Sequence, residues 1–102
     1  MRYARYDLFM IRTLKDKEAE RIWNGLRSRR LPPGVQQTAR RKSRMLNNAQ
    51  TLDDLRIPPA NRLEALRGDR RGQYSIRIND QWRICFVWRQ GDAYDVEIVD
   101  YH

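Results

Sequence analysis

The feature that most constrains the fold is an alternation of apolar and polar residues along the last third of the chain. It runs through residues 73–78, 82–88 and 93–99, which are separated by turns of only a few residues. A period of two is typical of strands that bury one face, because successive side chains point to opposite sides of a sheet. Connections this short join antiparallel neighbours. A weaker segment at residues 63–67, where Glu64 breaks the alternation, is expected to add a fourth strand.

The first of these hairpins has one register that keeps its two faces distinct. A three-residue loop at residues 79–81 places Ile76 opposite Ile84 on one face. It places Arg77 opposite Arg83 on the other face, whereas a two-residue loop would mix apolar and charged residues on both. Two directly opposed arginines cost stability, because like charges repel. We therefore expect an anionic ligand to bind beside Arg77 and Arg83 and to relieve this repulsion.

The same reasoning sets the register of the last hairpin. Tyr101 is expected diagonally across from Arg83 on the exposed face. The pairs expected in the core are Trp88 with Tyr94, Phe86 with Val96, and Ile84 with Ile98.

The first half of the chain predicts a short strand and two helices. Residues 10–14 are expected to form the strand, and Asp16 can cap a helix whose apolar stripe is Ala19, Ile22, Trp23 and Leu26. Prolines and a glycine at residues 32–34 precede a second helix at about residues 34–47, with Val35, Ala39, Met45 and Leu46 facing inwards. This order predicts one α+β domain over residues 10–102, with both helices on one face of a four-stranded antiparallel sheet. Residues 1–9 are expected to be an N-terminal extension.

The positive charge is unevenly distributed. The net charge of +8 arises entirely within residues 1–60, because residues 61–102 carry equal numbers of acidic and basic side chains. Between Glu20 and Asp53 there is no acidic residue, but there are eight basic ones: Arg21, Arg27, Arg29, Arg30, Arg40, Arg41, Lys42 and Arg44. Such a block favours a polyanionic partner, since binding phosphates releases counterions. The alternative is a solvated helix face that keeps the protein soluble.

Several classes of protein are disfavoured by what the sequence lacks. One cysteine and one histidine cannot form a disulfide or a zinc cluster. No apolar run is long enough to span a membrane, and the first residues do not resemble a secretion signal. The loop at residues 68–72 lacks the lysine and spacing of a phosphate-binding glycine loop. We expect a cytoplasmic protein without metal or cofactor.

The exposed face carries groups suited to cleaving RNA without a metal. That reaction needs a base for the 2′-hydroxyl, an acid for the leaving oxygen, and cations for the developing negative charge. Arginine side chains fit phosphate oxygens, a histidine titrates near neutrality, and a tyrosine can stack on a base. The candidates for these roles are Arg67, Arg77, Arg83, Asp100, Tyr101 and His102. Solvated arginines and an idle terminal histidine are the alternative interpretation.

Three segments of this chain resemble the HigB-type toxins, or plasmid maintenance system killer proteins, of the RelE/ParE superfamily. They are the run from Asn61 to Arg70, the stretch Ser-Ile-Arg-Ile-Asn-Asp-Gln-Trp-Arg-Ile at residues 75–84, and the end of the chain from Glu97 to His102. The resemblance covers essentially all of residues 10–102. It implies the RelE-like α+β fold.

This resemblance implies a toxin that enters the ribosomal A site and cuts messenger RNA as a metal-independent endoribonuclease. It also implies a helix-turn-helix antitoxin of the HigA type as a partner, and docking of the basic helices, with Arg40, Arg41, Lys42 and Arg44, on ribosomal RNA. The family's catalytic roles map onto Arg67, Arg83, Asp100, Tyr101 and His102, and Arg77 is expected to bind RNA on the same face. Some relatives carry a histidine where Glu64 stands here. The alternatives are a ParE-like inhibitor of DNA gyrase and a plain RNA-binding module.

Overall fold

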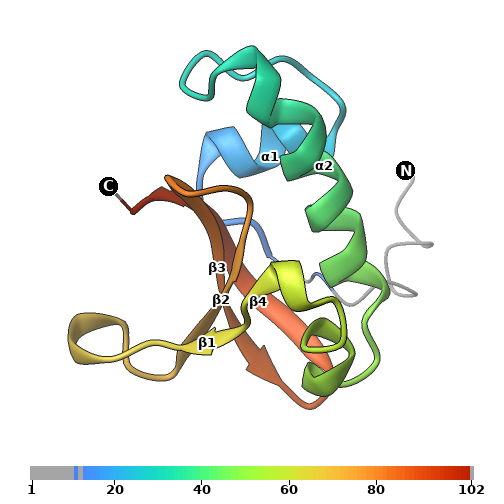
Figure 1. Ribbon diagram of the computed structural model, residues 1–102, viewed down its shortest axis with the longest axis vertical. Coiled ribbons are helices and arrows are strands. Elements are labelled where there is room, and N and C mark those ends of the chain that lie inside the picture. The colour runs from blue at the N-terminus through green and yellow to red at the C-terminus, as the bar shows by residue number, and fades with distance from the viewer. Residues whose placement is uncertain (1–10, 12, 102) are drawn as a thin grey trace.

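The computed structural model describes residue 11 and residues 13–101 (Figure 1). Helices α1 (Lys17–Trp23) and α2 (Pro33–Asn48) come first, followed by 3-10 turns at Leu52–Leu55 and Pro59–Asn61. Strands β1 (Glu64–Ala65), β2 (Gln73–Arg77), β3 (Trp82–Arg89) and β4 (Asp92–Asp100) follow, with another 3-10 turn at Gly68–Arg70. The predicted α+β class is confirmed.

The four strands form one antiparallel sheet in the order β1-β2-β3-β4. The helices lie on one side of it (Figure 1). On that covered face, Ile84, Phe86 and Ile98 pack in the same core as Ile22 of α1 and Leu46 of α2. The other side is called the open face below.

The predicted register of the β2–β3 hairpin is confirmed. Ile76 pairs with Ile84, and Arg77 pairs with Arg83. The loop is stabilised by Asn79, whose Oδ1 accepts hydrogen bonds from the backbone N–H groups of Gln81 and Trp82 at 2.9 and 2.8 Å. An asparagine that bonds its own backbone in this way favours a turn over continued strand.

The predicted register of the last hairpin is only partly correct. Ile84 does pair with Ile98, but Trp88 pairs with Ala93, and Tyr94 pairs with Val87. The difference arises from a β-bulge, in which Phe86 lies opposite two residues of β4 instead of one. Consequently Tyr94 lies on the open face with Val87, and not in the core beside Trp88.

The bulge is built around Asp95, which adopts a left-handed backbone with a φ of 51°. Its N–H donates to the side-chain oxygen of Thr13 at 2.6 Å, and the N–H of Val96 donates to the Thr13 carbonyl at 3.1 Å. At the tip of the hairpin, Gln90 and Gly91 also have positive φ, as a two-residue primed turn requires. The tight turn and the bulge together shift the outer half of β4 by one residue.

The segment before α1 pairs with the same strand. Ile11 and Leu14 form isolated parallel bridges with Ala93 and Val96, so the described part of the predicted first strand is two bridges instead of a continuous strand. Met10 and the predicted extension at residues 1–9 lie outside the described residues. The expected domain boundary at residue 10 therefore stays a prediction.

Helix α1 begins as predicted and ends early. The carboxylate of Asp16 accepts a hydrogen bond from the N–H of Ala19 at 2.6 Å and caps the helix. The helix stops at Trp23, and Gly25 takes a left-handed conformation with a φ of 77°. Leu26, expected in the apolar stripe, is therefore 50% exposed.

A buried polar pair links α2 to the segment that precedes β1. Lys42 is only 4% exposed, and its ammonium donates a hydrogen bond to Oδ1 of Asn61. The amide of Asn61, itself fully buried, donates to the Leu55 carbonyl at 3.0 Å. Burial lowers the pKa of Lys42, and the neighbouring positive charges of Arg41 and Arg77 lower it further. A buried ammonium needs such an acceptor, because an unpaired charge away from water is costly.

This pair yields a prediction about stability. Replacing Asn61 by alanine leaves the Lys42 ammonium and the Leu55 carbonyl without their partner, so we expect a loss of roughly 3 kcal/mol in the free energy of unfolding. Urea denaturation followed by circular dichroism measures this loss. The matched control is Asn48→Ala at the exposed end of α2, which should change stability by less than about 0.5 kcal/mol. Similar values for the two variants would contradict the structural role of Asn61.

Candidate functional site

The open face of the sheet gathers most of the chemically active side chains. Because residues alternate along each strand, this face receives Ser75 and Arg77 from β2, Arg83 and Cys85 from β3, and Glu97 from β4. Each of these residues stands opposite or diagonal to another across the antiparallel pairs. The strand register thus brings these five residues together.

Arg83 is the most firmly held of these residues. Its side chain is nearly buried, with the residue 8% exposed, and its Nε donates to Oγ of Ser75 at 2.7 Å. Its Nη2 donates to the carbonyl of Arg62, which has a left-handed backbone with a φ of 43°. The carboxylate of Glu64 lies 3.9 Å from the same nitrogen. These contacts fix the plane of the guanidinium before any ligand arrives.

The opposed residue, Arg77, is neutralised within the protein. Its guanidinium forms an ion pair with Asp80 in the loop of the hairpin. Part of the Arg77–Arg83 repulsion is thus offset inside the protein, and the expectation that an anionic ligand binds beside these arginines stays a prediction. Each arginine has a carboxylate nearby, Asp80 for Arg77 and Glu64 for Arg83, and these negative charges reduce the repulsion.

Tyr101 lies against Arg83 at the end of β4. The Arg83 guanidinium carbon is 5.9 Å from the centroid of the Tyr101 ring, within the range of a cation–π contact. The backbone N–H of Tyr101 donates to the Gln81 carbonyl at 2.6 Å, which holds the ring in place. Its hydroxyl lies within hydrogen-bonding reach of the Cys85 thiol. The ring remains 39% exposed and is available to a ligand.

Cys85 is fully buried beneath this ring. Burial raises the pKa of its thiol above the ordinary value, although the neighbouring Arg70 partly offsets this. A thiol that stays protonated is a poor nucleophile. Cys85 therefore supports the site by packing.

Arg70, which was not among the predicted site residues, also reaches the open face. Its Nη1 donates to Oε1 of Glu97 at 2.9 Å and to Oε1 of Gln73 at 3.1 Å. The bond to Glu97 raises the pKa of the Arg70 guanidinium, so its charge is permanent. Lys15 adds a second cation 3.6 Å from the same Glu97 oxygen. The only sequence signal for Arg70 was its place in the loop between β1 and β2.

The remaining predicted catalytic residues are Arg67, Asp100 and His102. Arg67 is exposed just before the 3-10 turn at Gly68–Arg70. Asp100 pairs with Trp82, and its carboxylate accepts a hydrogen bond from Nε2 of Gln81 at 3.2 Å. This strand position belongs to the covered face, so Asp100 and Tyr101 diverge. His102 follows Tyr101 in the sequence and lies outside the described residues.

Helix α2 carries the predicted basic surface, with one exception. Arg41 and Arg44 are exposed, whereas Arg40 is half-buried and donates its Nε to the Ile22 carbonyl at 3.3 Å. With Gly34, Gln37 and Thr38 they line a hollow of about 430 Å³. Lys42 does not belong to this surface: it stands three residues after Ala39 on the inward stripe, so its ammonium is buried against Asn61.

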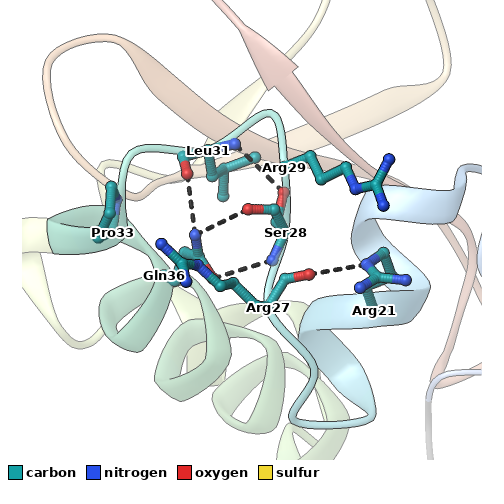
Figure 2. A pocket seen from close by; sticks show the side chains of 7 residues that line it. All are labelled: Arg21, Arg27, Ser28, Arg29, Leu31, Pro33 and Gln36. Atoms are coloured by element: carbon teal, nitrogen blue, oxygen red, sulfur yellow. Dashed lines mark hydrogen bonds between the residues drawn. The ribbon is translucent and has the colours of Figure 1, made fainter.

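A second basic hollow lies at the loop between the two helices. Figure 2 shows Arg21, Arg27 and Arg29 gathered around this loop, where they line a hollow of about 400 Å³. Gln36 holds the loop: its amide donates to the carbonyls of Ser28 and Leu31 at 3.0 and 2.9 Å (Figure 2). The two hollows form the basic helical surface, defined here as Arg21, Arg27 and Arg29 together with Arg40, Arg41 and Arg44.

Within residues 11 and 13–101, no three histidine, cysteine or acidic side chains are grouped so that they could hold a metal ion. Over the same residues, no helix has the length and apolar character needed to cross a membrane.

Comparison with known proteins places these residues in a family context. Residues 12–102 match the family described as RelE-like toxin of type II toxin-antitoxin system HigB. Toxin HigB-1 of Vibrio cholerae is 42% identical over 80 residues, which cover 78% of this chain and 84% of that protein. Endoribonuclease HigB of Proteus vulgaris is 46% identical over 41 residues, which cover 40% of this chain and 45% of that protein.

The environment of Tyr101 yields a prediction about its titration. Burial raises the pKa of the Tyr101 hydroxyl, and the neighbouring thiol raises it further. We therefore expect Tyr101 to ionise at a higher pH than a free tyrosine, whose pKa is about 10. The difference in absorbance at 295 nm between the wild type and Tyr101→Phe, followed as the pH rises, isolates this group. Ionisation of Tyr101 below pH 10 would contradict the described environment.

Proposed function

Because the chain belongs to the HigB-like family of RelE-like toxins of type II toxin–antitoxin systems, we propose that it is an endoribonuclease that cleaves messenger RNA during translation. The observation that supports this most directly is the fixed Arg83 guanidinium beside the accessible Tyr101 ring. A cation held in place by buried hydrogen bonds needs no reorganisation when negative charge develops on a phosphate. The adjacent ring offers a surface on which a base can stack.

The proposed reaction is attack of the 2′-hydroxyl on the adjacent phosphorus, with departure of the 5′-oxygen. Arg83 stabilises the negative charge on the non-bridging oxygens, and the exposed Arg67 supplies a second cation from the loop beside the sheet. Tyr101 orients the base next to the cleaved bond. His102 accepts the proton of the attacking 2′-hydroxyl and donates a proton to the leaving 5′-oxygen. An imidazole suits both steps, because it titrates near the operating pH. Asp100 orients the end of β4 through its bond with Gln81.

The proposed partners follow from charge and family. The basic helical surface supports docking on ribosomal RNA, because it offers six arginines, most of them exposed. Ribosome dependence places the activity in the bacterial cytoplasm. A type II system implies an antitoxin, and we propose a HigA-like helix-turn-helix protein in that role.

The test of the site is primer extension on messages translated in the presence of each variant. We expect Arg83→Ala to lower cleavage at least about 100-fold, as the loss of a fixed charge-stabilising donor does in other enzymes. Tyr101→Ala, which removes an exposed side chain, tests the same site with less risk to folding. Arg71→Ala, an exposed arginine in the loop before β2, is the control and should cleave like the wild type.

Two outcomes would overturn this proposal. Undiminished cleavage by both folded site variants would show that these residues do not act. Growth arrest with intact messages and altered DNA supercoiling would favour a gyrase inhibitor.

The basic helical surface gives a separate prediction about ribosome binding. The double variant Arg41→Glu and Arg44→Glu should weaken binding and lower the slope of log affinity against log salt by about 1 to 2, since each lost phosphate contact removes nearly one counterion. Sedimentation with ribosomes at several salt concentrations measures both quantities. The double variant Lys17→Glu and Arg56→Glu makes the same change in net charge elsewhere on the surface. Equal slopes for the two double variants would assign Arg41 and Arg44 to solubility instead.

A further inference from the structure

Arg89 and Tyr94 form a stacked pair at the tip of the β3–β4 hairpin. The Arg89 guanidinium carbon lies 4.6 Å from the centroid of the Tyr94 ring. Together with Gln90 these two residues line a hollow of about 400 Å³. Arg89 is exposed and Tyr94 is half-buried, so the hollow is accessible.

This pair lies on the open face, the same face as Arg83. Tyr94 pairs with Val87, and Val87 alternates in phase with Cys85 and Arg83 along β3. The bulge at Asp95 produces this placement, because without it Tyr94 would face the core beside Trp88.

The spacing along β3 suits a single-stranded ligand. Arg83 and Arg89 are six positions apart along β3, which corresponds to about 20 Å of strand. A few nucleotides of extended single strand can span such a distance. Between the two ends lies the Arg70–Glu97 ion pair, in which the acidic side chain is neutralised. The open face therefore presents an aromatic ring with an arginine at each end and a charge-compensated centre.

We propose that Arg89 and Tyr94 form a second base-stacking site for the RNA strand whose cleaved phosphate lies at Arg83 and Tyr101. The identity of the ligand rests on the proposed function. The base stacks on the Tyr94–Arg89 pair, because aromatic rings and guanidinium planes both bind nucleobases through their faces. The carboxamide of Gln90 provides hydrogen-bonding groups for the edge of that base. This site holds the strand a few nucleotides from the cut and so sets its direction across the sheet.

The test is binding of a single-stranded octaribonucleotide in which one 2′-deoxy sugar blocks cleavage, measured by fluorescence anisotropy. We expect Tyr94→Ala to raise Kd about 10-fold, consistent with the loss of one stacked base. Tyr94→Phe keeps the ring and should bind within 2-fold of the wild type. Arg71→Ala serves again as the control for loss of one positive charge. Circular dichroism and urea denaturation establish that each variant is folded.

A second measurement separates stacking from a merely structural role of the hairpin. Abasic sites are moved along the octanucleotide one position at a time. One position should weaken binding to the wild type about 10-fold and have no effect on binding to Tyr94→Ala. Equal Kd values for the wild type and Tyr94→Ala, no measurable RNA binding by the wild type, or an abasic penalty that persists in Tyr94→Ala would each overturn the proposal.

Failure here is distinguishable from failure of the proposed function. If Arg83→Ala and Tyr101→Ala cleave translated messages like the wild type, the catalytic assignment falls, while RNA binding that depends on Tyr94 still stands. If those variants lose cleavage and Tyr94→Ala binds RNA like the wild type, only the second stacking site falls.

Discussion

The burial of the Arg83 guanidinium is the constraint on which the rest of the structure depends. A charged side chain with so little exposure is tolerated only where its donors are matched by fixed acceptors. Those acceptors come from different parts of the chain: the hydroxyl of Ser75 on β2 and the carbonyl of Arg62 before β1. The short strand β1, only two residues long, therefore does more than extend the sheet. It anchors the segment that delivers the Arg62 carbonyl to the guanidinium.

The bulge in β4 separates two kinds of surface on one strand. On the C-terminal side of the bulge, Ile98 faces the core. On the side toward the hairpin tip, Tyr94 faces the open side of the sheet. Both ends of the open face thereby acquire an aromatic ring next to an arginine, Tyr101 with Arg83 and Tyr94 with Arg89. A regular strand could not supply both, because an uninterrupted alternation would bury Tyr94 beside Trp88. The irregularity is thus what makes a continuous ligand-binding track geometrically feasible.

Local patterns predicted those parts of the protein that depend on neighbouring residues. The β2–β3 register follows from alternation and a short loop, and the cap at Asp16 follows from residues within one helical turn. The bulge could not be predicted in this way, because it is stabilised by Thr13, which lies 82 residues from Asp95. Lys42 was predicted to lie on the basic surface and is buried instead. This could not be predicted locally for a similar reason, because its acceptor, Asn61, is 19 residues away. Its position on the inward stripe of α2, three residues after Ala39, was nevertheless a usable signal.

The candidate site was predictable to the extent that it follows from the register. Arg83 and Tyr101 were expected on one face and are found in contact. Arg70 was missed because a loop carries it to Glu97 from 27 residues away. The role of His102, which rests on the family resemblance, stays a prediction.

Because of the ion pairs on the open face, the sheet and the helices differ in how strongly they attract a negatively charged partner at a distance. Asp80 neutralises Arg77, and Glu97 neutralises Arg70, so this face exerts a weaker long-range field than its arginines suggest. The arginines of α2 and of the loop before it keep most of the uncompensated charge. In the proposed complex with RNA, the helices therefore set the rate of encounter, because attraction at a distance governs how often two molecules meet. In the same proposed complex, the sheet determines at contact range how long the RNA strand stays bound and in which orientation.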